Sequence, residues 1–178
     1  MDADDYTIRY ARSDEFNALP AIERAAAALF RVTAFPYLAA AALASEGIAP
    51  HHDRVWVAVA PTGQLVGFAI AHPLDGSAYL HELDVDPAHG RRGLGRRLID
   101  AVAEWARQEG LQAITLTTFR AVPWNAPYYA RLGFRPLGDD HLSPGLRAVQ
   151  QAEAEMGLPI GDRLCMRLDL TPGPHAKE

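Results

Sequence analysis

The chain has 178 residues, of which 49% are hydrophobic and 22% charged, which is enough apolar material for one domain with its own core. Its formal net charge of −5 argues against a nucleic-acid partner, because phosphate contacts need an excess of Lys and Arg. The acidic start MDADDYTIRY differs from a signal peptide, and no apolar run approaches the roughly 18 residues of a membrane span, so we expect no membrane partner.

Hydrophobic periodicity and turn residues predict an alternation of strands and helices. In chain order the pattern predicts a strand over 6–10, helices over 14–31 and 37–46, strands over 54–60, 65–72 and 78–85, a helix over 93–109, a strand over 113–119, a helix over 125–132, a strand over 134–137, a helix over 143–156 and a strand over 163–170. Ser13 and Ser143 are the expected N-caps of the first and last helices. Phe35-Pro36 should end the first helix, and Gly47 the second.

A glycine turn, residues 90–97, lies between the strand over 78–85 and the helix that follows. Gly93 and Gly95 lack a Cβ, so their backbone can approach a ligand oxygen closely. The first N–H groups of the helix have no intrahelical partners, and the helix dipole is positive at that end. The turn therefore predicts an anion site, and the arginines beside it, unfavourable with the dipole alone, point the same way.

The spacing of the turn separates three kinds of glycine loop. A P-loop needs a lysine after its second glycine, but Lys177 is the only lysine of the chain. A dinucleotide-binding loop needs a third glycine where Leu98 stands, and an acid closing a second strand where we expect helix. The segment instead resembles the acetyl-CoA pyrophosphate loop of the GNAT superfamily of acyl-CoA N-acyltransferases, Arg/Gln-x-x-Gly-x-Gly/Ala after a strand ending Leu-x-Val-x-Pro. The matching positions are Leu83, Val85, Pro87, Gly93 and Gly95.

The chain departs from this loop pattern at one position and matches a second pattern downstream. Gly90 stands where the family usually has Arg or Gln, but a loop that works through backbone amides tolerates this. The family's second motif, Asn-x-x-x-Tyr-x-x-x-Gly-Phe, is matched by Asn125, Tyr129, Gly133 and Phe134. Because both motifs occur in the right order, the chain is identified as a member of the GNAT superfamily.

The resemblance implies an α/β fold in which a mixed sheet of about seven strands, flanked by helices, splays apart at a cofactor cleft. It implies one domain over residues 1–170, and we expect a polar tail over 171–178. It also implies acetyl-CoA as co-substrate and no metal. The residues implied in cofactor binding are Val85, Arg91, Arg92, Gly93, Leu94, Gly95, Arg96, Arg97, Asn125 and Tyr129.

The resemblance also implies catalytic roles. The backbone N–H of Val85 would stabilise the oxyanion, Tyr129 would protonate the leaving sulfur and Asn125 would orient the pantetheine arm. Glu82 would be the general base, with a pKa raised by burial between leucines. His81 and Asp84 are alternatives, and strand alternation is expected to put both on the face opposite Glu82 unless the bulge common in this family intervenes.

The expected reaction is transfer of an acetyl group to a primary amine, on a small molecule or a peptide, by direct attack in a ternary complex. Two alternatives stay open, a silent acetyl-CoA-binding sensor or structural module and a nucleotide-dependent oxidoreductase. We expect Cys165, the only cysteine, to be a core residue rather than a nucleophile. Because it has no disulfide partner in the chain, it favours a cytoplasmic location. The resemblance allows a homodimer. Residues expected around the acceptor are Phe30, Phe35, Tyr37, His51, His52, Trp124 and His141.

Overall fold

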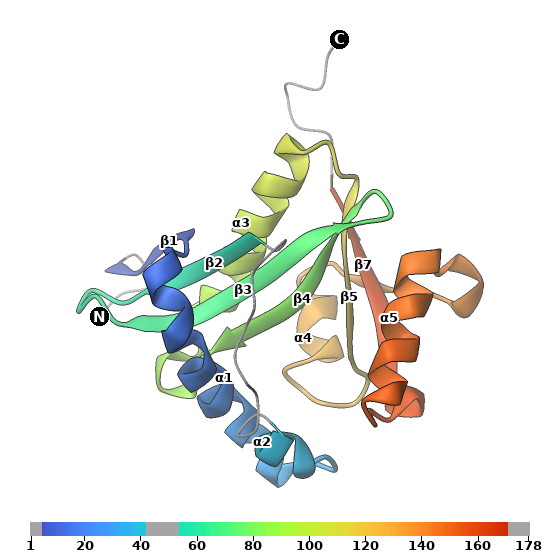
Figure 1. The fold of residues 1–178 in the computed structure, drawn as a ribbon, viewed down its shortest axis with the longest axis horizontal. Coiled ribbons are helices and arrows are strands. Elements are labelled where there is room, and N and C mark those ends of the chain that lie inside the picture. The colour runs from blue at the N-terminus through green and yellow to red at the C-terminus, as the bar shows by residue number, and fades with distance from the viewer. Residues whose placement is uncertain (1–4, 42–53, 171–178) are drawn as a thin grey trace. The chain divides into compact units, whose positions relative to one another are not determined.

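The computed structural model describes residues 5–41 and 54–170 (Figure 1). The chain divides into two compact units. The first comprises Met1–Ala71 and Glu82–Val102, and the second comprises His72–His81 and Ala103–Glu178. Among the described residues, no helix combines the length and the apolar character needed to cross a membrane. The expected single domain over 1–170 stays a prediction, and the expected tail lies outside the described residues.

Seven strands form among the described residues, as the sequence predicts. They are β1 (Thr7–Tyr10), β2 (Arg54–Val59), β3 (Leu65–Leu74), β4 (Ser77–Val85), β5 (Ala113–Phe119), β6 (Arg135–Pro136) and β7 (Arg163–Asp169). Hydrogen bonding orders them β1-β2-β3-β4-β5-β7-β6. The β4–β5 pair is parallel, whereas β1–β2, β2–β3, β5–β7 and β6–β7 are antiparallel. The mixed sheet is therefore confirmed.

The helices are α1 (Leu19–Ala27), α2 (Tyr37–Ala41), α3 (Leu94–Gln108), α4 (Ala126–Arg131) and α5 (Pro144–Glu155). Helix α3 buries Leu94, Leu98, Val102 and Trp105, the apolar stripe that its sequence predicts. Ser143 caps α5 as expected, because its hydroxyl accepts a hydrogen bond from the Leu146 N–H at 3.3 Å. The part of the predicted second helix beyond Ala41 lies outside the described residues.

The predicted helix over 14–31 is wrong at both ends. Ser13–Ala18 and Ala28–Val32 are 3₁₀ segments on either side of α1. Pro20 lies in the first turn of α1. Because proline has no N–H to donate to the preceding turn, an α-helix begins there instead of running through.

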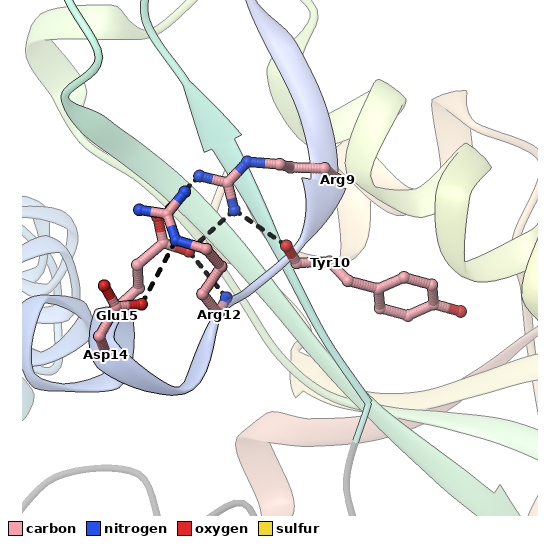
Figure 2. A network of polar contacts seen from close by, with 5 residues as sticks. All are labelled: Arg9, Tyr10, Arg12, Asp14 and Glu15. Atoms are coloured by element: carbon pink, nitrogen blue, oxygen red, sulfur yellow. Dashed lines mark hydrogen bonds and ion pairs between the residues drawn. The ribbon is translucent and has the colours of Figure 1, made fainter.

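Ser13 is also not the cap of this region, since the N-cap is Arg12. The first turn is held by the Glu15 carboxylate, which accepts hydrogen bonds from the Arg12 N–H at 2.8 Å and the Arg9 guanidinium at 2.8 and 2.6 Å (Figure 2). The hydrogen bonds from Arg9 lower the pKa of Glu15 to about 2. The glutamate three residues into the turn therefore does the capping, although the serine before it looked like the better cap.

Each unit has its own buried cluster. In the first unit, α1 packs its apolar face on β2 and β3 through Leu19, Ile22, Val55, Val57, Phe68 and Ile70 (Figure 1). In the second unit, α5 lies beside β7, with Leu142 and Leu146 packed near Tyr79 and Cys165. Burial raises the pKa of the Cys165 thiol to about 11, which agrees with the expected packing role.

Helix α5 also carries a buried polar contact to the strands of its unit. The Arg163 guanidinium of β7 donates to both carboxylate oxygens of Glu153, with Nε to Oε2 at 2.9 Å and Nη2 to Oε1 at 2.7 Å. The Thr117 hydroxyl of β5 donates a short hydrogen bond to the same carboxylate. The hydroxyl of Tyr79 in β4 lies 3.2 Å from that of Thr117, so four elements share this network.

Candidate functional site

The glycine turn has an unusual backbone. Both Arg91 (φ 60°) and Gly93 (φ 72°) lie in the left-handed region, and α3 begins at the next residue, Leu94. Asp86 starts the segment by accepting a hydrogen bond from the Ala88 N–H at 2.9 Å. Two left-handed residues within three positions turn the chain sharply at the start of α3, so the turn leaves the first N–H groups of the helix available, as an anion site requires.

The structure explains the departure at Gly90. Its backbone is extended, with φ −63° and ψ 167°, so no left-handed conformation demands a glycine. However, a Cβ at this position would lie 3.1 Å from the carbonyl oxygen of Pro87, to which the Gly90 N–H also donates. The tight 3₁₀ turn at Pro87–His89 therefore leaves little room for the family's Arg or Gln.

Three of the four arginines beside the turn contact the chain itself. Arg96 pairs with Asp100 one helical turn later at 3.2 Å. Arg97 donates to the Tyr6 carbonyl at 2.7 Å, and the Arg92 guanidinium lies 5.8 Å from the centre of the Tyr6 ring. Asp100 thus balances the charge of Arg96, whereas these contacts of Arg92 and Arg97 are to neutral groups of Tyr6. The exposed Arg91 stays a candidate phosphate contact.

Val85, the expected oxyanion donor, ends β4 where this strand approaches β3 closely. A Cβ on Gly67 of β3 would lie 3.0 Å from the Asp84 carbonyl oxygen and 3.2 Å from Cγ2 of Val85. The next residue, Asp86, donates its N–H to the Val66 carbonyl at 2.8 Å. The register of β2 and β3 also shifts at Ala58/Val59, opposite Val66. Gly67 therefore lets the backbone around Val85 sit against β3.

Glu82 and Asp84 form a hydrogen-bonded carboxyl pair, and Glu23 of α1 places a third carboxyl group near them. Burial raises the pKa of Glu82, and repulsion by Asp84 and Glu23 raises it further. The pKa of Asp84 is raised chiefly by burial as well. The expectation that alternation separates Asp84 from Glu82 is wrong, because residues i and i+2 of a strand share a face. The expected rise in the pKa of Glu82 is confirmed.

His81, the alternative base, belongs to the second unit and is exposed. Its ring centroid lies 6.2 Å from that of Tyr79 and 6.3 Å from that of His72. It is therefore part of an aromatic group on β3 and β4 and stays a candidate base. The expected bulge beside it stays a prediction.

The second motif forms α4 and the residue before it. The Asn125 side chain donates from Nδ2 to the Thr118 hydroxyl at 3.0 Å, which ties α4 to β5. Its carbonyl oxygen Oδ1 is buried and has no hydrogen-bond partner among the described residues. Tyr129 is 8% exposed, and its ring packs edge-on against Phe134 with centroids 5.4 Å apart. Asn125 thus holds an acceptor atom that a ligand N–H could satisfy.

The residues expected around the acceptor are only partly described. Phe35 and Tyr37 pack edge to face at 6.4 Å in the first unit, while His141 contacts Asp140 at 2.9 Å in the second. His51 and His52 lie outside the described residues. Within residues 5–41 and 54–170, no cluster of three or more His, Cys, Asp or Glu side chains is arranged to hold a metal ion.

Three contributors to the site, namely Tyr6, Glu23 and Gly67, were not predicted from the sequence. Tyr6 and Gly67 had a weak signal, as an aromatic at a strand start and a glycine inside a strand, which often marks close backbone approach. Glu23 reads as an ordinary solvated helix residue, so only the packing of α1 reveals its charge near the carboxyl pair.

The chain matches the model of the acetyltransferase (GNAT) family over residues 11–134. This range includes both motifs, the second of which ends at Phe134. The chain belongs to the GNAT acetyltransferase family. The class of protein expected from the two motifs is therefore confirmed.

Solved structures share the fold at low sequence identity. An acetyltransferase of the GNAT family from Staphylococcus aureus Mu50 is 17% identical with a TM-score of 0.69, over 93% of this chain and 99% of its own. The PaiA N-acetyltransferase of Thermoplasma acidophilum, solved in complex with coenzyme A, is 15% identical with a TM-score of 0.65, over 92% and 98%. The ribosomal-protein-S18-alanine N-acetyltransferase of Escherichia coli is 20% identical with a TM-score of 0.61, over 97% and 99%.

Proposed function

We propose that this chain is an N-acetyltransferase that moves the acetyl group of acetyl-CoA to a primary amine by direct attack in a ternary complex. The observation that carries the proposal is the carboxyl pair of Glu82 and Asp84 on β4, the strand that leads into the glycine turn. A chain that only bound acetyl-CoA would need the turn but no carboxyl group with a raised pKa beside it. The neighbour from Thermoplasma acidophilum, solved in complex with coenzyme A, supports a coenzyme A thioester as co-substrate.

The glycine turn is the proposed pyrophosphate site. Backbone N–H groups between Arg91 and Arg97 would donate to the phosphate oxygens, and the positive end of α3 would favour their charge. In the second unit, the unpartnered Oδ1 of Asn125 would accept a hydrogen bond from an amide N–H of the pantetheine arm. The proposed cofactor contacts are Val85, Arg91, Arg92, Gly93, Leu94, Gly95, Arg96, Arg97, Asn125 and Tyr129.

The chemistry begins with deprotonation of the acceptor. A primary amine has a pKa near ~10, so at neutral pH only about one molecule in a thousand is the free base. Glu82 accepts this proton, and its raised pKa makes it a stronger base than an ordinary carboxylate. The amine nitrogen then forms a bond to the thioester carbon, and the Val85 N–H stabilises the resulting oxyanion. The oxyanion re-forms the carbonyl as the C–S bond breaks, and Tyr129 donates a proton to the leaving sulfur. The nitrogen gives up its second proton, which restores the Tyr129 hydroxyl and leaves a neutral amide.

The test is release of free thiol from acetyl-CoA in the presence of a panel of amines, followed over pH. With an acceptor of low pKa, kcat/KM should fall as the pH drops through the raised pKa of the base, because the base must be unprotonated. Glu82→Gln should remove this limb and much of the rate, whereas Glu104→Gln on the exposed surface of α3 should change neither.

Two results would redirect the proposal. If the limb survives in Glu82→Gln and disappears in His81→Ala, the base is His81. If coenzyme A binds but no amine in the panel releases thiol, the silent binding module is the better description. A small-molecule or peptide acceptor, a homodimer and a cytoplasmic location stay predictions.

A further inference from the structure

We propose that Tyr6 is a positioning residue for acetyl-CoA, holding the glycine turn in its phosphate-binding shape before the cofactor arrives. This inference rests on the proposed function, because it concerns the same turn. Tyr6 precedes β1 and is only 2% exposed, yet it is far in the chain from both sequence motifs.

Tyr6 contacts the segment around the turn in three ways. Its hydroxyl lies 2.9 Å from Nδ1 of His89, and the two rings meet edge to face at 5.8 Å. The Arg92 guanidinium lies 5.8 Å from the centre of the Tyr6 ring. The Arg97 guanidinium donates to the Tyr6 carbonyl oxygen at 2.7 Å. One residue therefore contacts the chain just before the turn, within it and in the first turn of α3.

These contacts bracket the disfavoured part of the backbone. Arg91, with φ 60°, adopts a left-handed conformation that a residue with a Cβ rarely visits. His89 precedes Arg91, whereas Arg92 and Arg97 follow it, so Tyr6 fixes the chain on both sides. A turn already held in this shape loses less conformational entropy when it binds pyrophosphate, and this preorganisation raises affinity.

The alternative is that Tyr6 only stabilises the fold. The two roles predict different effects of a substitution. Loss of a positioning residue weakens the binding of ligands that use the turn, whereas loss of a residue that only stabilises the fold lowers the melting temperature and the amount of folded protein. Acetyl-pantetheine carries the same thioester as acetyl-CoA but lacks the pyrophosphate. A defect that depends on the pyrophosphate therefore isolates the positioning role.

The experiment compares Tyr6→Phe with the wild-type chain and with Tyr10→Phe as the matched control. Tyr10, the last residue of β1, is 50% exposed and packs on Trp56 instead of the turn. Tyr6→Phe keeps the ring and the backbone carbonyl, so it removes only the hydrogen bond to His89. Loss of one hydrogen bond typically raises a dissociation constant by a few-fold to about tenfold.

We expect Tyr6→Phe to raise the calorimetric Kd for coenzyme A and the KM for acetyl-CoA by about 3- to 10-fold, with kcat unchanged. Its kinetics with acetyl-pantetheine, and both parameters of Tyr10→Phe, should match the wild type. His89→Ala should reproduce the loss, and the double variant should add little to it, because both changes remove the same bond. If Tyr6→Phe proves too unstable to assay, His89→Ala alone carries the same comparison of the two donors.

Three results would overturn the role of Tyr6. These are an unchanged Kd for coenzyme A in the folded Tyr6→Phe and His89→Ala variants, equal losses with both acetyl donors, and a lowered kcat at unchanged KM. The proposed function fails differently, because in that case the wild-type chain itself would not bind coenzyme A or turn over acetyl-CoA.

Discussion

Replacing Gly67 by alanine perturbs the proposed oxyanion donor without touching any proposed catalytic side chain. The new Cβ would lie 3.0 Å from the Asp84 carbonyl oxygen and 3.2 Å from Cγ2 of Val85, and 3.5 Å from Cβ of Ala58. The first two distances are shorter than ordinary van der Waals contact, and the first involves backbone. Strand β4 must therefore shift by a few tenths of an ångström at Asp84 and Val85.

The size of the effect follows from what that amide is proposed to do. Complete loss of one oxyanion donor costs about 3 kcal/mol of transition-state stabilisation, and a partial displacement costs a fraction of it, about 1–2 kcal/mol. That corresponds to a fall in kcat of roughly 5- to 30-fold. Overpacking should also lower the free energy of unfolding by about 1–3 kcal/mol.

The assay is kcat at saturating acetyl-CoA, measured well below the melting temperature and with folding checked by circular dichroism. The matched control is Gly161→Ala, since Gly161 has no left-handed backbone and no described heavy atom within 4 Å of its Cβ position. We expect the control to keep both kcat and stability. A folded Gly67→Ala variant with full kcat would show that the Val85 amide is not a precisely placed donor in the reaction.

Three further changes test other parts of the argument. Gly93→Val should weaken coenzyme A binding at least tenfold in calorimetry while the chain stays folded, because a β-branched residue is disfavoured at φ +72°; Gly63→Val, at φ +85° in the β2–β3 turn, should not. Tyr129→Phe should lower kcat about 10- to 100-fold with little change in KM, and an unaltered kcat would leave Tyr129 a packing role. Glu15→Gln should lower the free energy of unfolding at pH 7 by about 1–2 kcal/mol, since the pKa of Glu15 is lowered to about 2. That contribution is complete above about pH 4.5 and is lost as the pH falls toward 2, so denaturant titrations at pH 7 and pH 3 should show the difference between variant and wild type shrinking.

Local signals predicted much of the fold. β5 was predicted over the residues that it occupies, and the Ser143 cap with Pro144 after it identified α5. Both signals depend on neighbours in the chain. The prediction of the first helix was wrong at its start, because the apolar periodicity continues across Pro20 although the α-helix begins beside it.

The candidate site was less predictable, because part of it depends on contacts between distant residues. The pairing of Glu82 with Asp84 follows from the two-residue period of a strand and could have been predicted. The charge of Glu23 beside that pair could not, because it depends on how α1 packs. The same holds for Tyr6, whose contact with His89 joins residues 83 positions apart.

The buried ion pair of Glu153 and Arg163 limits which substitutions evolution can accept at these two positions. Removing either partner alone leaves an unpaired buried charge and lowers the free energy of unfolding by about 3–5 kcal/mol. Selection should therefore remove most single changes at these positions. A paired change to apolar residues of similar volume avoids that cost and is often neutral. Among homologues that keep α5, the two positions should therefore covary, carrying either both charges or neither, and the hydroxyl of Thr117 should be lost most often where the charges are gone.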